Sequence, residues 1–104
     1  MTAYMVIEIT VHDAEMYAHY VALVEDIITR YGGKYLVRGG QITALAGGWE
    51  PERVVVIAFP DREAILRCLS SDEYQELAQW REHSTQSKAI IVDGYTAERQ
   101  AKDG

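Results

Sequence analysis

The segment Arg53-Val54-Val55-Val56-Ile57-Ala58-Phe59 presents apolar and mostly β-branched side chains on both faces of an extended chain. This composition is typical of a strand buried inside a sheet. Over residues 3–11, apolar side chains recur at every second position, and this period of two predicts a strand with two distinct surfaces. A third strand is predicted over 34–38. We expect it to be interrupted by a bulge at Gly39-Gly40 and to resume over 41–45.

Between these strands, apolar side chains recur at the three- and four-residue spacing of amphipathic helices. One such stripe spans residues 17–31, with Asp13 placed to cap its N-terminus and Gly32-Gly33 placed to end it. A second helical region is predicted over 62–69 and a third over 72–84, with a break at the two serines between them.

A final strand over 89–92 completes the predicted order strand, helix, strand, strand, helix, strand. This order predicts an α+β fold of the ferredoxin-like βαββαβ type, an antiparallel sheet with helices on one face. The 104 residues fit one domain, which we place at 4–95, followed by a polar C-terminal tail over 96–104.

The composition excludes several classes of function. Ten Lys and Arg residues against sixteen Asp and Glu residues give a formal net charge of −6, which argues against nucleic acid and anionic membranes as partners. The single cysteine, Cys68, excludes an internal disulfide framework and a zinc site made of cysteines alone. The sequence shows neither a signal peptide nor an apolar run of about 20 residues, so we expect a cytoplasmic protein.

The strand pattern predicts one sheet face that the helices leave open. The side chains expected on the covered face are Ile7, Ile9, Val55, Ile57 and Phe59. The opposite face also carries apolar side chains, namely Tyr4, Val6, Leu36, Val54, Val56 and Ile91. Burying such side chains stabilises by roughly 1.5–3 kcal/mol each. We therefore expect a two-fold homodimer that packs through this open face. The alternative is a monomer whose own tail shields the face.

Several motifs resemble one known family. In chain order they are Tyr31-Gly-Gly-Lys-Tyr-Leu-Val-Arg-Gly-Gly40, Gly47-x-Trp-x-Pro-x-Arg53, Val54-Val-Val-Ile-x-Phe-Pro60, Ser71-x-Glu-Tyr-Gln75, and Arg81 followed by a last strand ending in Gly94. Over residues 4–95 the sequence resembles the bacterial domain-of-unknown-function 1330 family of the dimeric α/β-barrel superfamily. The resemblance implies a ferredoxin-like subunit whose sheet packs on the sheet of a partner.

The sequence departs from the family pattern at three places. The family usually has Glu where this chain has Ala58, an aromatic pair where it has Cys68-Leu69, and Pro where it has Asp72. If the missing carboxylate is an acid or base in relatives, this chain lacks it. Glu8 points to the same face by strand alternation, and our hypothesis is that it substitutes as the catalytic carboxylate.

Two arginines are candidate ligand-binding residues. Arg38 precedes two glycines on a strand, where its guanidinium would bind a carboxylate in a bidentate manner. The alternative for Arg38 is a salt bridge with Glu8 or a similar acid inside the dimer cleft. Arg81 lies on the apolar stripe of the last helix, where an arginine is expected either to line a cleft or to form a structural ion pair.

Three tyrosines, Tyr20, Tyr35 and Tyr74, are candidate wall residues of a pocket for an apolar or aromatic ligand, with an ordinary core position as the alternative. His12, His19 and His83 are dispersed. We therefore expect no metal site, no haem and no other cofactor. The glycine pairs lack the spacing of a nucleotide-binding loop.

These observations favour a homodimer that binds a small organic acid or aromatic molecule in one cleft per subunit. Arg38 and Arg81 would bind the anionic group, and the three tyrosines would form the walls. Superfamily analogy offers a cofactor-free isomerase or monooxygenase as the alternative. A structural or regulatory dimer without a ligand is the third interpretation.

Overall fold

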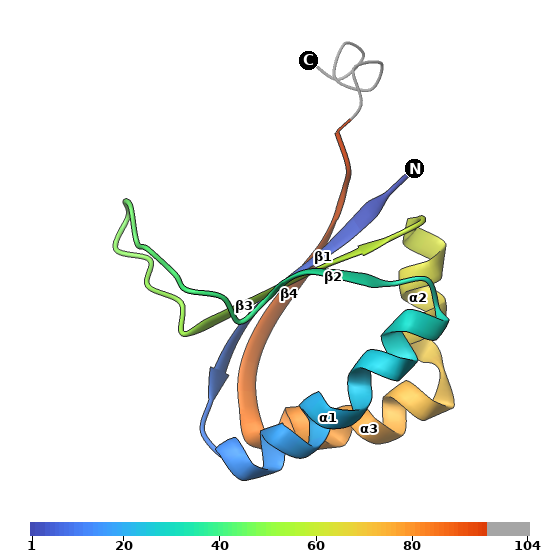
Figure 1. Cartoon of the computed structure of the whole chain (residues 1–104), viewed down its shortest axis with the longest axis horizontal. Coiled ribbons are helices and arrows are strands. Elements are labelled where there is room, and N and C mark those ends of the chain that lie inside the picture. Colours follow the sequence, from blue (N-terminus) through green and yellow to red (C-terminus); the bar gives the residue numbers. More distant parts are fainter. Residues whose placement is uncertain (96–104) are drawn as a thin grey trace.

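A four-stranded antiparallel sheet, ordered β2-β3-β1-β4, forms one layer of the computed structural model, which describes residues 1–95 (Figure 1). Its strands are β1 (Ala3–Val11), β2 (Lys34–Arg38), β3 (Arg53–Phe59) and β4 (Thr85–Asp93). The other layer consists of the helices α1 (Ala14–Arg30), α2 (Arg62–Ser70) and α3 (Asp72–Ser84), all on one side of the sheet. The predicted α+β, ferredoxin-like class is confirmed. The predicted polar tail over 96–104 lies outside the described residues.

The helices begin where capping side chains occur in the sequence. Asp13 Oδ1 accepts a hydrogen bond from the Met16 amide at 3.1 Å, as predicted for the start of α1. Ser71 Oγ accepts from the Tyr74 amide at 3.2 Å and separates α2 from α3. Helix α1 ends just before Gly32, whose φ of 88° is a conformation that glycine adopts without steric cost. The predicted caps are therefore confirmed.

Two predicted strand boundaries are wrong. Residues 41–45 form no strand; they belong to an irregular segment, 39–52, which we call the arm, and it projects from the sheet on the side away from the helices (Figure 1). The chain leaves the sheet at Gly39, whose φ is +72°, so that the following residues have no neighbouring strand to pair with. Strand β4 begins at Thr85, four residues before the predicted start at Ala89, because β1 offers it a pairing partner over its full length.

A β-bulge in β2 corrects the expected orientation of its side chains. Strict alternation predicts Tyr35 and Arg38 on opposite faces, and we expected the irregularity at Gly39-Gly40. Instead the register shifts between Tyr35 and Val37: Tyr35 pairs with Ile57, and Arg38 pairs with Val55. Leu36 is the extra residue of the bulge. Because Ile57 and Val55 both face the helices, Tyr35 and Arg38 face them as well.

The hydrophobic core lies between the sheet and the helices. Its β1 and β3 members are Ala3, Met5, Ile9, Val55, Ile57 and Phe59. Ile91, predicted on the open face, pairs with Met5 and packs against this core. Its neighbours Ile90 and Val92, 61% and 45% exposed, lie on the open face instead. In the described part of the chain, no helix has the length and apolarity needed to span a bilayer.

Candidate functional site

A cavity of about 270 Å³ lies between the sheet and helices α1 and α3. The structure brings all five predicted ligand-binding residues to its lining: Tyr20, Tyr35, Arg38, Tyr74 and Arg81. Glu8 does not line it. That residue pairs with Val54 and Lys88 in the sheet, and its side chain belongs to the open face with Tyr4 and Val6.

The strand register gives the cavity a polar end and an apolar end. Arg53, Ile9 and Ser87 form one row across β3, β1 and β4. The next row, two residues along, contains Arg38, Val55, Ile7 and Ala89. The third row contains Tyr35, Ile57 and Met5. Since strands rise about 3.4 Å per residue, the first row, which contains Arg53, lies roughly 14 Å from the third row. One end is therefore cationic, and the other consists of apolar side chains and a tyrosine ring.

Arg38 closes the β2 side of the cavity. Its Nη1 donates to Glu25 Oε1 and its Nη2 to the carbonyl oxygen of Val21, both at 2.9 Å, so that β2 is tied to α1. The guanidinium carbon lies 4.4 Å from the centre of the Tyr35 ring. Glu25, not Glu8, is the acid that pairs with Arg38, because Glu8 lies on the other face of the sheet.

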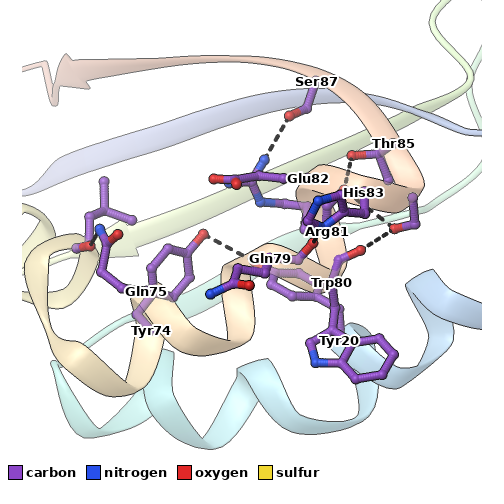
Figure 2. A network of polar contacts seen from close by, with 12 residues as sticks. Tyr20, Tyr74, Gln75, Gln79, Trp80, Arg81, Glu82, His83, Thr85 and Ser87 are labelled. Carbon is purple, nitrogen blue, oxygen red and sulfur yellow. Dashed lines mark hydrogen bonds and ion pairs between the residues drawn. The ribbon is translucent and has the colours of Figure 1, made fainter.

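Arg81 crosses the opposite side, from α3 to β4 (Figure 2). Its Nη1 donates to Ser87 Oγ at 2.9 Å, and its Nη2 lies 3.9 Å from Glu82 Oε1. Burial by itself would lower the pKa of the Arg81 guanidinium, but Tyr74, Tyr20 and Glu82 outweigh it, so that the pKa is raised. Arg81 therefore stays protonated and places a positive charge at this side of the cavity.

Two buried tyrosine hydroxyls meet between α1 and α3. Tyr20 Oη and Tyr74 Oη are 3.2 Å apart (Figure 2). Burial, followed by the proximity of Tyr74, raises the pKa of Tyr20 far above its ordinary value. Burial also raises the pKa of Tyr35, to about 12. The phenols of Tyr20 and Tyr35 therefore stay protonated near neutral pH and present hydroxyl groups, not phenolates, to the cavity.

Arg53 and Tyr17 are cavity residues that the sequence reasoning did not select. Arg53 Nε donates to Tyr17 Oη at 3.1 Å. Arg53 shares its face of β3 with Val55 and Ile57, and this two-residue period was the signal that would have placed it inside. Its position at the first residue of the strand made it resemble a solvent-exposed end.

The charge of the lining is unusual for this chain. Arg38, Arg53 and Arg81 line the cavity, against one carboxylate, Glu82, among the described lining residues. The whole chain carries a net charge of −6. A cationic cavity in an acidic protein has the electrostatics of a site for an anion.

The histidines lie apart from the cavity. His19 packs on Trp80 with 4.0 Å between ring centres, and His12 and His83 are exposed. Among residues 1–95, no cluster of three or more His, Cys, Asp or Glu side chains has an arrangement that would hold a metal ion.

The model of a family described as a domain of unknown function, DUF1330, matches residues 2–95. The chain belongs to the DUF1330 family. No curated protein matches the sequence. Ala58, the position where the family resemblance implies Glu, pairs with Tyr4 and shares the open face with Glu8. Glu8 lies four residues further along β1 than Tyr4, roughly 14 Å from that position.

Solved structures with the same fold share little sequence with this DUF1330 chain. A protein of unknown function from Rhodopseudomonas palustris is 19% identical, with a TM-score of 0.78 and coverage of 91% of this chain and 83% of that chain. A dimeric ferredoxin-like protein of unknown function from Jannaschia sp. CCS1 is 10% identical, with a TM-score of 0.71 over 90% and 100% of the two chains. SnoaB, a cofactor-independent oxygenase from Streptomyces nogalater, is 18% identical, with a TM-score of 0.65 over 92% and 95%. At these identities the likeness shows the fold alone.

Proposed function

We propose that this DUF1330 protein binds a small organic acid with an apolar or aromatic body in the cavity under its sheet. The observation that carries the proposal is the gathering of three arginines around the first two rows of a cavity of about 270 Å³ whose third row consists of apolar side chains and a tyrosine. Guanidinium groups bind carboxylates through charge-assisted hydrogen bonds. Arg38 and Arg81 lie on the two sides of the cavity and would bind the anionic group of the ligand, and Tyr20, Tyr35 and Tyr74 form walls for its body.

The proposed functional unit is a homodimer that packs through the open face of the sheet. This face exposes apolar side chains on both edge strands: Leu36, Val37, Ile90 and Val92. The arm projects on the same side (Figure 1) and exposes Leu45 and Trp49, which are 94% and 62% accessible. The structural neighbour from Jannaschia sp. CCS1 is described as dimeric, which supports self-association of this fold. A second copy would cover the open face and lie beside the arm.

A cofactor-independent oxygenase or isomerase is the second candidate. The paired hydroxyls of Tyr20 and Tyr74, buried beside the charged Arg81, would hydrogen-bond a substrate oxygen on which negative charge develops. The description of SnoaB as a cofactor-independent oxygenase agrees with this candidate. Either activity requires that the acid first bind in the cavity. Oxygen consumption during turnover of the bound acid would identify an oxygenase, and conversion of the acid to an isomer would identify an isomerase.

A thermal-unfolding assay tests the binding proposal with 2-naphthoate as the acid and 2-naphthamide as its uncharged analogue. A ligand at 100 times its Kd stabilises the protein by about 2.7 kcal/mol. We expect the acid to raise the Tm of the wild type, the amide to raise it much less, and Arg81→Gln to reduce the response to the acid. The control is Arg67→Gln, which removes an exposed arginine of α2 outside the cavity lining.

Two results would overturn the proposal. One is an equal response to the acid and the amide, since the arginines would then recognise no charge. The other is the absence of any response of the wild type to the acid, which would support the third interpretation, a structural or regulatory dimer without a ligand.

A further inference from the structure

Arg53 differs from the other two cavity arginines in what its guanidinium contacts. Arg38 is paired with Glu25, and Arg81 lies near Glu82. Among residues 1–95, no carboxylate lies within 4.0 Å of the Arg53 nitrogens, and the side chain makes one hydrogen bond, from Nε to the hydroxyl of Tyr17. An arginine has five N–H donors. The Nη groups of Arg53 therefore keep four donors without a hydrogen-bond acceptor in the described chain.

The surrounding residues fix the Arg53 guanidinium in place. Its carbon atom lies 5.6 Å from the centre of the Tyr17 ring, and Nε is bound by the hydroxyl of the same tyrosine. On another side lies Gly39, where an added Cβ would collide with Nη1 and lie 2.7 Å from Cζ. The neighbouring Gly40 has nothing within 4 Å of such an atom. Gly39 thus provides the space for Arg53, whereas Gly40 does not.

The sequence predicted a β-bulge at the Gly39-Gly40 pair. The structure instead places the Arg53 side chain against Gly39. The amide of Gly39 donates to the carbonyl oxygen of Val54 at 3.0 Å, so that the glycine is bound to the strand that carries Arg53. The positive φ of Gly39 favours a glycine here, and a Cβ at this position would displace the guanidinium of Arg53.

We propose that Arg53, positioned by Tyr17 and Gly39, is the residue that binds the carboxylate of the ligand through its two Nη groups. The apolar body of the ligand then extends along β3, past Val55 and Ile57, toward the ring of Tyr35. The ligand class is a monocarboxylate on a flat apolar body. This inference rests on the proposed function and adds to it the binding group and the orientation of the ligand.

The existing partners of the other arginines favour Arg53 for this role. A ligand carboxylate would compete with Glu25 and the Val21 carbonyl at Arg38, and with Ser87 at Arg81. At Arg53 the incoming carboxylate has no acidic residue of the described chain to displace. Arg38 and Arg81 then add positive potential from both sides, and their contacts with α1 and β4 stay intact.

Isothermal titration calorimetry with 2-naphthoate tests the role of Arg53. A hydrogen bond to a charged group contributes about 1.5–3 kcal/mol, so we expect Arg53→Gln to weaken binding roughly 10- to 100-fold. Arg53→Lys keeps the charge but loses the bidentate geometry, and we expect an intermediate affinity. Gly39→Ala should weaken binding by displacing the guanidinium. Gly47→Ala is its matched control, because Gly47 has a similar φ of +77° and nothing lies within 4 Å of an added Cβ. Arg67→Gln is the control for net charge, and both controls should bind like the wild type.

The outcomes separate this inference from the proposed function. If Arg53→Gln binds 2-naphthoate like the wild type while Arg38→Gln or Arg81→Gln loses it, the inference is wrong and the proposed function stands. If the wild type does not bind the acid, the proposed function fails first. Equal losses of 2-naphthoate and 2-naphthamide affinity in Arg53→Gln would also overturn the inference, because the residue would then shape the cavity without recognising charge. Circular dichroism and the Tm of each unliganded variant check that it is folded.

Discussion

The hydroxyl pair of Tyr20 and Tyr74 allows a quantitative test of how the cavity wall is held together. The two oxygens lie 3.2 Å apart and join α1 to α3. Tyr20 has no other hydrogen-bond partner among residues 1–95. Both hydroxyls interact electrostatically with Arg81, Tyr74 more strongly than Tyr20. The two single variants, Tyr20→Phe and Tyr74→Phe, should therefore differ in cost although each removes one oxygen atom.

Tyr74→Phe leaves the Tyr20 hydroxyl buried and unpaired, which costs about 1–3 kcal/mol. Tyr20→Phe leaves Tyr74 with Arg81 as a neighbour, and we expect a cost near 1 kcal/mol, that of one net hydrogen bond. The double variant places two apolar rings together. Its cost should fall short of the sum of the single costs by roughly 1 kcal/mol, the coupling typical of residues in contact.

Urea denaturation of the wild type and the three variants measures these free energies of unfolding. All four proteins must be compared at one protomer concentration, because dissociation of a dimer would otherwise contribute to the apparent stability. Tyr31→Phe is the control, since the Tyr31 hydroxyl forms no hydrogen bond within the described chain. Strict additivity of the two single costs would refute the reasoning, because it would mean that each hydroxyl is solvated independently from the cavity.

Two further predictions concern pH and assembly. Burial raises the pKa of Tyr35 from 10.0 to about 12 and that of Cys68 from 9.0 to about 11. The stability that these protonated groups contribute is complete at pH values below their pKa in the unfolded chain. It is lost as the pH rises through their pKa in the folded protein. The free energy of unfolding should therefore fall between about pH 9 and 12, with a shallower slope in Tyr35→Phe. Val56→Asp on the open face should convert the proposed dimer to a monomer in sedimentation equilibrium, whereas Leu66→Asp on the exposed surface of α2 should not. A monomeric wild type would refute the proposed interface.

Local sequence signals predicted the elements whose pattern is complete within a few residues. Helix α3 was expected over 72–84 and spans Asp72–Ser84, because Ser71 caps its start. Local sequence signals failed where hydrogen-bonded pairing between strands decides the structure. The residues from Thr85 to Lys88 are polar, yet they form a strand because β1 is long enough to pair with them. Residues 41–45 have strand-like side chains and form none, because the chain has already left the sheet at Gly39.

The cavity arginines show why a list of candidate residues does not by itself define a site. Without a bulge, an inward Tyr35 would place Arg38 on the open face, far from α1. The extra residue, Leu36, turns both side chains inward, and Arg38 then meets Glu25 of α1. Satisfying Arg38 in this way leaves Arg53 as the cavity arginine without an acidic partner in the described chain. The binding role proposed for Arg53 therefore depends on one inserted residue in the neighbouring strand, a dependence that neither residue type nor spacing reveals.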